Sequence, residues 1–278
     1  MKDERVRITI LVDNQTFPDL TAEHGLSLWI ETGGKHLLFD TGQGIALKSN
    51  ARELGVNLAE TDMLVLSHGH YDHTGGITDV LECAGHSEIF CHPGVMKPRY
   101  SIVNRKAKPI QMPWEQMAAI DKLPANRLHW VSQPVSISPT AALTGPIPRK
   151  TEFEDTGGPF FLDPDGRRGD PLDDDLALYI VTKTGLIVVV GCCHAGLVNT
   201  LHHIQSLTNG AAIRAVIGGF HLLNADNRRL AGTIAALQSV KPEKIVPCHC
   251  TGEKAVIKIQ TALGERVAVG AAGMVFEF

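Results

Sequence analysis

The stretch Ser67-His68-Gly69-His70-Tyr71-Asp72-His73-Thr74-Gly75-Gly76 places three imidazoles and one carboxylate within six residues. It follows the apolar run 63–66 and precedes a second apolar segment, so we expect a loop at the end of a buried strand. Imidazole and carboxylate groups are the side chains that bind divalent ions such as zinc. A turn whose histidines form only local hydrogen bonds is the alternative, and four ligand-type residues in six argue against it.

The spacing within this stretch predicts how the ligands divide. His68 and His70 are two residues apart, so in an extended backbone they point to the same side and can share one ion. Asp72 and His73 follow where the chain turns into a helix, and we expect them to face a second ion. Hydrolytic sites with two metals hold their ions roughly 3.5–4 Å apart.

Composition bounds the remaining possibilities. The 278 residues are 44% hydrophobic and 20% charged, which fits one globular domain over 1–278 with a substantial core. A net charge of −4 argues against a nucleic-acid partner. We expect no membrane span and no signal peptide, because the apolar runs are short and the acidic start leads directly into a strand. The six cysteines include a Cys192-Cys193 pair and a Cys248-His249-Cys250 triplet, which favour a reducing cytoplasm over disulfides. The sequence is compatible with a homo-oligomer as well as with a monomer.

Strand and helix patterns alternate along both halves of the chain, which suggests a sandwich with helices on its outside. Four apolar strands each end in a loop that carries histidine, at 68–73, 194, 221 and 249. Because the ends of strands in a layered sheet gather at one edge, we expect these loops to form one site.

Two cationic regions are candidates for substrate contact. Residues 94–128 mix lysine and arginine with proline and tyrosine, and we expect a surface insertion there. An ordinary solvated face is the alternative to a lid that grips an anion. The candidate substrate residues are Lys97, Arg99, Tyr100 and, after a Gly-Pro turn, Arg149. Residues 151–174 are polar and predict a long loop.

At this point a family resemblance is clear. The stretch 67–76 matches the HxHxDH signature of the metallo-β-lactamase superfamily, and Asp40-Thr41-Gly42 resembles the early DTG step of that family. Residues 191–196, 218–221 and 247–252 resemble the GCSHxG, GGFH and PCHCTG segments of one branch, some of whose members are 7,8-dihydropterin-6-yl-methyl-4-(β-D-ribofuranosyl)aminobenzene 5′-phosphate synthases. The resemblance implies an α/β fold, a four-layer αββα sandwich of two mixed β-sheets with outer helices. It also implies that Asp40 supports the metal loop and does not bind metal.

The resemblance implies a ligand set with two departures from the family pattern. The usual third histidine is missing near 144–146, and His194 can fill that position. The usual bridging aspartate corresponds to Cys192, which either bridges or packs. The expected ligands are His68, His70, Asp72, His73, His194, His249 and Cys192. Strand alternation should turn Cys248 and Cys250 away from the site, so we expect them to be structural.

These features favour a metal-dependent hydrolase that uses metal-activated water on a phosphoester or another phosphorylated small molecule. One or two divalent ions are expected, zinc first, with manganese, iron and magnesium as alternatives. Asp72 would orient the nucleophile, and His221 would hydrogen-bond the leaving group. A pterin-linked transferase is the first rival function. A diiron redox protein is disfavoured because such proteins carry Glu where this chain has His70, and a non-catalytic metal-binding domain is the last alternative.

Overall fold

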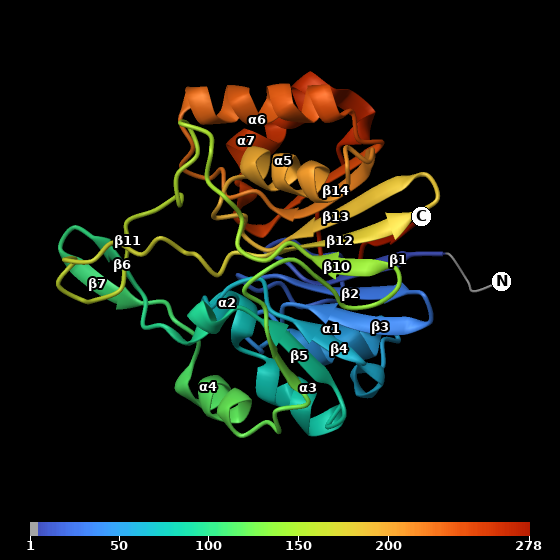
Figure 1. Ribbon diagram of the computed structural model, residues 1–278, viewed down its shortest axis with the longest axis vertical. Helices are drawn as coiled ribbons and strands as arrows, with labels where there is room; N and C mark the ends of the chain where they lie inside the picture. The colour runs from blue at the N-terminus through green and yellow to red at the C-terminus, as the bar shows by residue number, and fades with distance from the viewer. Residues whose placement is uncertain (1–4) are drawn as a thin grey trace.

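The computed structural model describes residues 5–278 and consists of two facing sheets with helices on both outer surfaces (Figure 1). The first sheet has the order β16-β1-β2-β3-β4-β5-β8 and the second the order β15-β14-β13-β12-β10-β9. Both sheets are mixed: β3, β4, β5 and β8 run parallel, as do β13, β14 and β15, and the remaining pairs are antiparallel. The four-layer αββα prediction is therefore confirmed.

The strands have the following bounds. The first sheet contains β1 (Arg7–Val12), β2 (Ser27–Thr32), β3 (Lys35–Phe39), β4 (Met63–Val65), β5 (Glu88–Cys91), β8 (Leu128–Trp130) and β16 (Val275–Glu277). The second contains β9 (Val135–Ser136), β10 (Ala141–Leu143), β12 (Ala177–Thr182), β13 (Gly185–Val190), β14 (Ile213–Gly219) and β15 (Lys244–Cys248). A small third sheet contains β6 (Tyr100–Val103), β7 (Lys106–Pro109) and β11 (Phe160–Phe161).

The helices divide between the two outer layers. In Figure 1 the first sheet carries α1 (Leu47–Glu53), α3 (Ile77–Cys83) and α4 (Trp114–Asp121), and the second carries α5 (Leu197–Leu207), α6 (Asn227–Val240) and α7 (Glu253–Leu263). The short α2 (Tyr71–Thr74) lies within residues 67–76, the candidate metal-ligand stretch. Turns of 3-10 helix span Leu58–Glu60, Pro93–Met96, His249–Thr251 and Gly264–Arg266. None of the helices between residues 5 and 278 combines the length and apolar character needed to cross a bilayer.

Strand β13 shows how the sequence specifies these layers. All of its side chains from Leu186 to Val190 are apolar and buried. Ile187 and Val189 belong to the core between the sheets, whereas Leu186 and Val188 pack under the helices of the second sheet. A strand covered on both faces needs apolar residues at every position, which is why this run lacks alternation.

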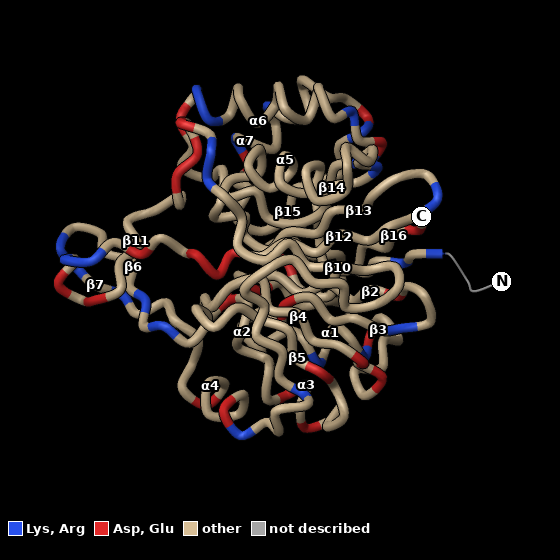
Figure 2. Tube along the Cα trace, in the orientation of Figure 1, with Lys and Arg blue, Asp and Glu red and all other residues tan. Residues whose placement is uncertain are grey.

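The segment 94–128 is divided between a projecting hairpin and the core. Strands β6 and β7 project from the sandwich in Figure 1, and Figure 2 shows lysine and arginine along them. These two strands were not predicted from the sequence. The chain then returns to the sandwich: the Tyr71 amide donates to the Ile110 carbonyl at 3.1 Å, and the Met112 amide donates to the Gly69 carbonyl at 2.8 Å. Ile120 of α4 is fully buried. The hairpin is thus anchored directly on the metal-ligand stretch.

Arg99 corrects one prediction. Its side chain is buried at the base of the hairpin, where Nη1 donates to Asp174 Oδ2 at 2.8 Å and Nε lies 2.9 Å from Asp170 Oδ2. A guanidinium occupied by two buried carboxylates is not available to a substrate. Asp174 Oδ2 also accepts the Gly69 amide at 2.9 Å, so Arg99 supports the metal-ligand stretch from behind.

Replacing Arg99 by alanine is expected to destabilise the fold by about 3–5 kcal/mol, because two buried carboxylates lose their cation. Urea unfolding followed by circular dichroism measures the change. Lys97→Ala, two residues earlier, is the matched control and should change the free energy of unfolding by less than about 1 kcal/mol. Equal effects of the two substitutions would contradict the assigned role of Arg99.

Candidate metal centre

Five strand ends bring the candidate residues together. Strand β3 leads into Asp40, β4 into the stretch Ser67–His73, β13 into Cys192 and His194, β14 into His221, and β15 into His249. The strands preceding these residues are parallel neighbours within each sheet, so their carboxyl ends lie at the same edge. The two edges face each other across the sandwich, and the loops meet between them.

Asp40 fixes the shape of the metal-ligand stretch. Its Oδ1 accepts the Ser67 amide at 2.7 Å, and its Oδ2 accepts the Ser67 hydroxyl at 2.7 Å and contacts His73 Nδ1 at 2.7 Å. Gly69 lies against the neighbouring chain: a Cβ there would come within 2.4 Å of the Val95 carbonyl oxygen. The stretch is therefore held by a buried carboxylate and by a close approach that only glycine permits.

His68, His70 and His194 form the first ligand group. His68 Nε2 and His70 Nδ1 lie 3.0 Å apart. The His194 ring centroid is 4.8 Å from that of His68 and 4.9 Å from that of His70. His194 Nε2 is buried and has no hydrogen-bond partner. His194 therefore lies beside His68 and His70 with one ring nitrogen available to an ion.

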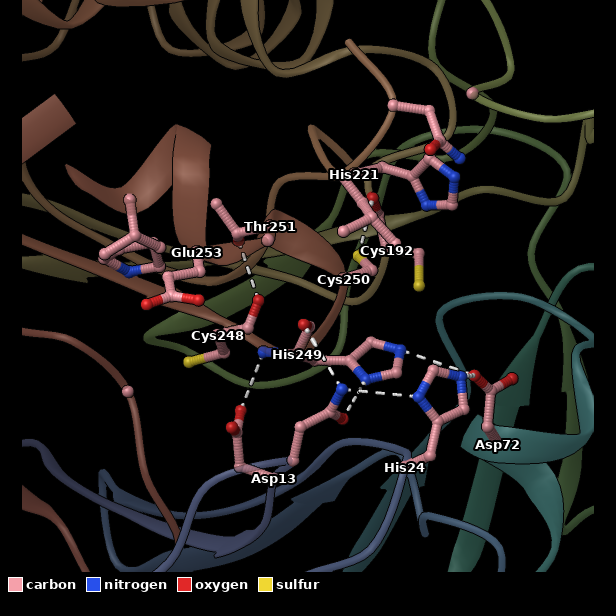
Figure 3. A pocket seen from close by; sticks show the side chains of 18 of the residues that line it. Asp13, His24, Asp72, Cys192, His221, Cys248, His249, Cys250, Thr251 and Glu253 are labelled. Atoms are coloured by element: carbon pink, nitrogen blue, oxygen red, sulfur yellow. Dashed lines mark hydrogen bonds and ion pairs between the residues drawn. The ribbon is translucent and has the colours of Figure 1, made fainter. Parts of the chain in front are cut away.

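Asp72, His73 and His249 form the second group, which His24 joins. Asp72 Oδ2 lies 3.4 Å from His249 Nε2 and 3.1 Å from His24 Nε2 (Figure 3). The rings of His73 and His249 lie 5.0 Å apart. His24 received no role from the sequence, because it precedes the motif by more than forty residues in a polar loop.

Cys192 lies between the two groups. Its Sγ is 3.1 Å from His73 Nε2. The Sγ atom of Cys192 lies within 4.8 Å of a ring nitrogen of His68 and of His194. It also lies within 4.8 Å of a ring nitrogen of His73 and of His249. A thiolate at this position can contact ions held by either group.

Four imidazoles share an arrangement that suits metal binding. The Nδ1 atoms of His68, His73, His194 and His249 contact Ser67 Oγ, Asp40 Oδ2, the Thr156 carbonyl and Asn14 Oδ1, each at 2.7 or 2.8 Å. Metal-binding histidines commonly use one ring nitrogen for such an outer contact, which leaves the other free for the ion. The residues present therefore fit one or two divalent ions.

The electrostatics of the two groups differ. Burial lowers the pKa of His68 and His194 well below the usual value and that of His70 to about 3, so all three rings are neutral near pH 7. Burial alone would raise the pKa of Asp72, but hydrogen bonds with His24 and His249 hold it well below its usual range. Neutral imidazoles and an ionised carboxylate are the protonation states that bind cations.

A cavity of about 970 Å³ opens beside these groups. Its lining includes His70, Asp72, His194, His221 and His249, and the Phe160 ring lies 5.3 Å from the His70 ring. Figure 3 shows His221 on one wall and Asp72, His24 and His249 on another. A small molecule in this cavity would contact both ligand groups.

The cation that lines the cavity differs from the predicted ones. Of Lys97, Arg99, Tyr100 and Arg149, none is among the lining residues. Arg149 instead donates to the backbone carbonyls of His194 and Pro171, which holds the His194 loop. Within residues 5–278, Lys108 is the only lysine or arginine in the lining, and its Nζ lies 5.2 Å from the centre of the Tyr71 ring. The sequence placed Lys108 in the cationic insertion but gave no signal that separated it from its neighbours.

Comparisons with known proteins agree with this geometry. The family model of the metallo-beta-lactamase superfamily matches residues 20–249. A 7,8-dihydropterin-6-methyl-4-(beta-D-ribofuranosyl)-aminobenzene-5'-phosphate synthase of Methanocaldococcus jannaschii is 34% identical over an alignment of 252 residues, and the match covers 84% of this chain and 83% of that protein. An uncharacterised protein of the same organism is 32% identical over 261 residues, covering 91% and 93%. The crystal structure of Tm1679, a metal-dependent hydrolase of the beta-lactamase superfamily, superposes with a TM-score of 0.83 at 29% identity over 98% of this chain and 99% of that one.

Asp40→Asn is expected to lower zinc affinity about 10–100-fold, because the amide cannot accept from Ser67 and His73 together. Competition with a chromophoric chelator measures the affinity. Asp62→Asn is the control, since Asp62 pairs with Lys35 on an exposed loop. Unchanged affinity in Asp40→Asn would show that the carboxylate does not organise the site.

Replacing both His68 and His70 by alanine is expected to remove the ion of the first group, because that group then retains one histidine, so the metal content should fall by about one ion per chain. Metal content after dialysis, measured by mass spectrometry, is the readout, and His202→Ala on the exposed face of α5 is the control. A double variant that keeps the wild-type metal content would contradict the assignment of His68 and His70 as metal ligands.

Proposed function

The chain belongs to the metallo-beta-lactamase superfamily, and from that premise we propose that it is a metal-dependent hydrolase acting on a phosphoester of a small molecule. The observation that carries the proposal is the set of four inward-facing imidazoles, each tethered at Nδ1, beside an open cavity. A site that binds metal only to stabilise a fold is closed to substrate, whereas these imidazoles lie beside an open cavity.

We assign the metal ligands by group. His68, His70 and His194 would hold one ion and Asp72, His73 and His249 a second. Cys192 would lie between them, because its sulfur is close to His68 and His194 and also to His73 and His249. Zinc suits this mixture of imidazole, carboxylate and thiolate best. When bound, such ions lower the pKa of a water molecule toward neutrality and polarise a phosphoryl oxygen.

The remaining cavity residues have distinct roles in this proposal. Asp72 would orient the attacking water, since it is ionised and lies on the cavity wall. His221 would donate a hydrogen bond to the leaving group, because it lines the cavity and its ring lies 4.3 Å from that of His194. Lys108 would bind a phosphate oxygen at the cavity mouth, where no carboxylate within residues 5–278 is paired with it.

A specific observation also favours a second function. The Methanocaldococcus jannaschii relative is named as a synthase, and 34% identity over most of both chains is compatible with a shared reaction. In that case the site would promote condensation of a dihydropterin diphosphate with a ribofuranosylaminobenzene phosphate, and no water would be consumed. The cavity of about 970 Å³ and the aromatic side chains of Phe17, Tyr71 and Phe160 in its lining suit a flat ring.

We also propose a cytoplasmic location. All six cysteines are free thiols in the structure, and three of them, Cys192, Cys248 and Cys250, line the cavity. Free thiols in a functional site are typical of a reducing compartment.

Zinc-loaded protein is expected to hydrolyse phosphodiester or phosphomonoester substrates, and activity should disappear with a chelator and return with zinc. A panel that also holds a lactone, a thioester and the pterin condensation pair measures the choice. Turnover only in the condensation assay would replace the hydrolase proposal by the synthase.

Lys108→Ala is expected to raise KM for a phosphorylated substrate about tenfold, the equivalent of ~1.4 kcal/mol, with little change in kcat. Lys106→Ala is the matched control, because Lys106 lies on the same strand and outside the cavity lining. An equal KM in both variants would exclude Lys108 from substrate binding.

A further inference from the structure

Two cysteines and a histidine form a cluster that the proposed reaction does not fully use. Cys192 follows β13, His221 follows β14, and Cys250 lies in the 3-10 turn after β15. One ligand atom of each residue lies within 4.8 Å of the other two. All three line the cavity, and Figure 3 shows them on one wall.

Backbone geometry brings Cys250 to this wall. Strand alternation would have turned it away, but His249 has a φ of 47°, which ends the extended backbone one residue earlier. Cys250 Sγ then lies 3.7 Å from the Cys192 carbonyl oxygen. A Cβ on Gly219 would come within 2.7 Å of Cys250 Sγ, so the absence of a side chain at Gly219 creates the space for the thiol. The expectation that Cys250 is structural is therefore wrong about its position, whereas Cys248 is buried in the core between the sheets.

His221 is held in place in a similar way. It has a φ of 47°, which is uncommon outside glycine. A Cβ on Gly157 would lie 1.9 Å from His221 Cδ2, so the 151–174 loop can pack on the ring only because residue 157 is glycine. The Nδ1 atom of His221 is buried and has no hydrogen-bond partner. Two cysteine sulfurs and one imidazole are thus positioned together, and the imidazole has a nitrogen without a hydrogen-bond partner.

We propose that Cys192, Cys250 and His221 form an additional metal site for a thiophilic divalent ion such as Zn²⁺ or Cd²⁺. Two sulfur ligands and one imidazole distinguish it from the two histidine-rich groups, and they match the ligands that soft ions prefer. Both sulfurs bind the ion as thiolates, so any proton that they carry is released to solvent. The fourth position faces the cavity, where water or a substrate atom completes the coordination.

The site has a consequence for activity. An ion there occupies His221 and Cys192, so excess zinc would inhibit an enzyme that needs His221 to assist its leaving group. This consequence rests on the proposed function, whereas the binding of the ion does not.

Cadmium titration of metal-free protein in an oxygen-free buffer tests the site directly. Wild type is expected to bind one more Cd²⁺ per chain than Cys250→Ser. The near-ultraviolet absorbance of cadmium thiolate is expected to fall at least about twofold in that variant, because Cys250 is replaced and Cys192 loses the ion of this site. Cys83→Ser, which removes an exposed thiol on α3, should match wild type in both readouts. Equal stoichiometry and equal thiolate absorbance in wild type and Cys250→Ser would overturn the proposal.

Cadmium NMR of the wild-type protein gives a test that needs no variant. An ion with two sulfur ligands is expected to resonate well downfield of ions held by nitrogen and oxygen. A spectrum of fully loaded protein without such a resonance would also overturn the site. Both readouts are independent of turnover, so an inactive protein that binds the additional ion would refute only the proposed function.

Discussion

The carboxylate of Asp40 is the interaction on which the site depends. It is fully buried, and it contacts the Ser67 amide, the Ser67 hydroxyl and His73 Nδ1. Burial alone would lower the pKa of His73, but the adjacent carboxylate raises it to about 9. The ring is therefore protonated and paired with Asp40 near pH 7, and an ion that binds His73 would have to displace a proton. One charge thus sets both the shape of the stretch and its response to metal.

A second support comes from the opposite side of the stretch and joins distant parts of the chain. Asp174 accepts the Gly69 amide and pairs with Arg99, while Arg149 holds the His194 loop through backbone carbonyls. The cationic residues near the site therefore serve mainly to position its ligands. Among the residues 5–278, Lys108 of the hairpin is the one lysine or arginine that lines the cavity.

Much of this could be predicted from the sequence, for identifiable reasons. The helices 77–83 and 197–207 follow from apolar periodicity, and the buried strand before Cys192 follows from its uninterrupted apolar run. Strand-end loops converge because parallel strands share an edge. Long-range pairing could not be predicted: Arg99 meets a carboxylate 75 residues away, and periodicity carries no information on such contacts. Cys250 was misplaced because the left-handed backbone at His249 breaks the alternation that the prediction assumed. Strand β7 was missed because its two lysines and its proline are unusual for a strand, and its partner β6 has only four residues.

We infer that five strand ends assemble two adjacent metal positions. The most direct measurement is an anomalous difference map at the zinc absorption edge, from crystals of zinc-loaded protein. We expect one zinc peak among His68, His70 and His194 and a second among Asp72, His73 and His249. A map without a peak at either position, in protein shown to contain stoichiometric zinc, would contradict it.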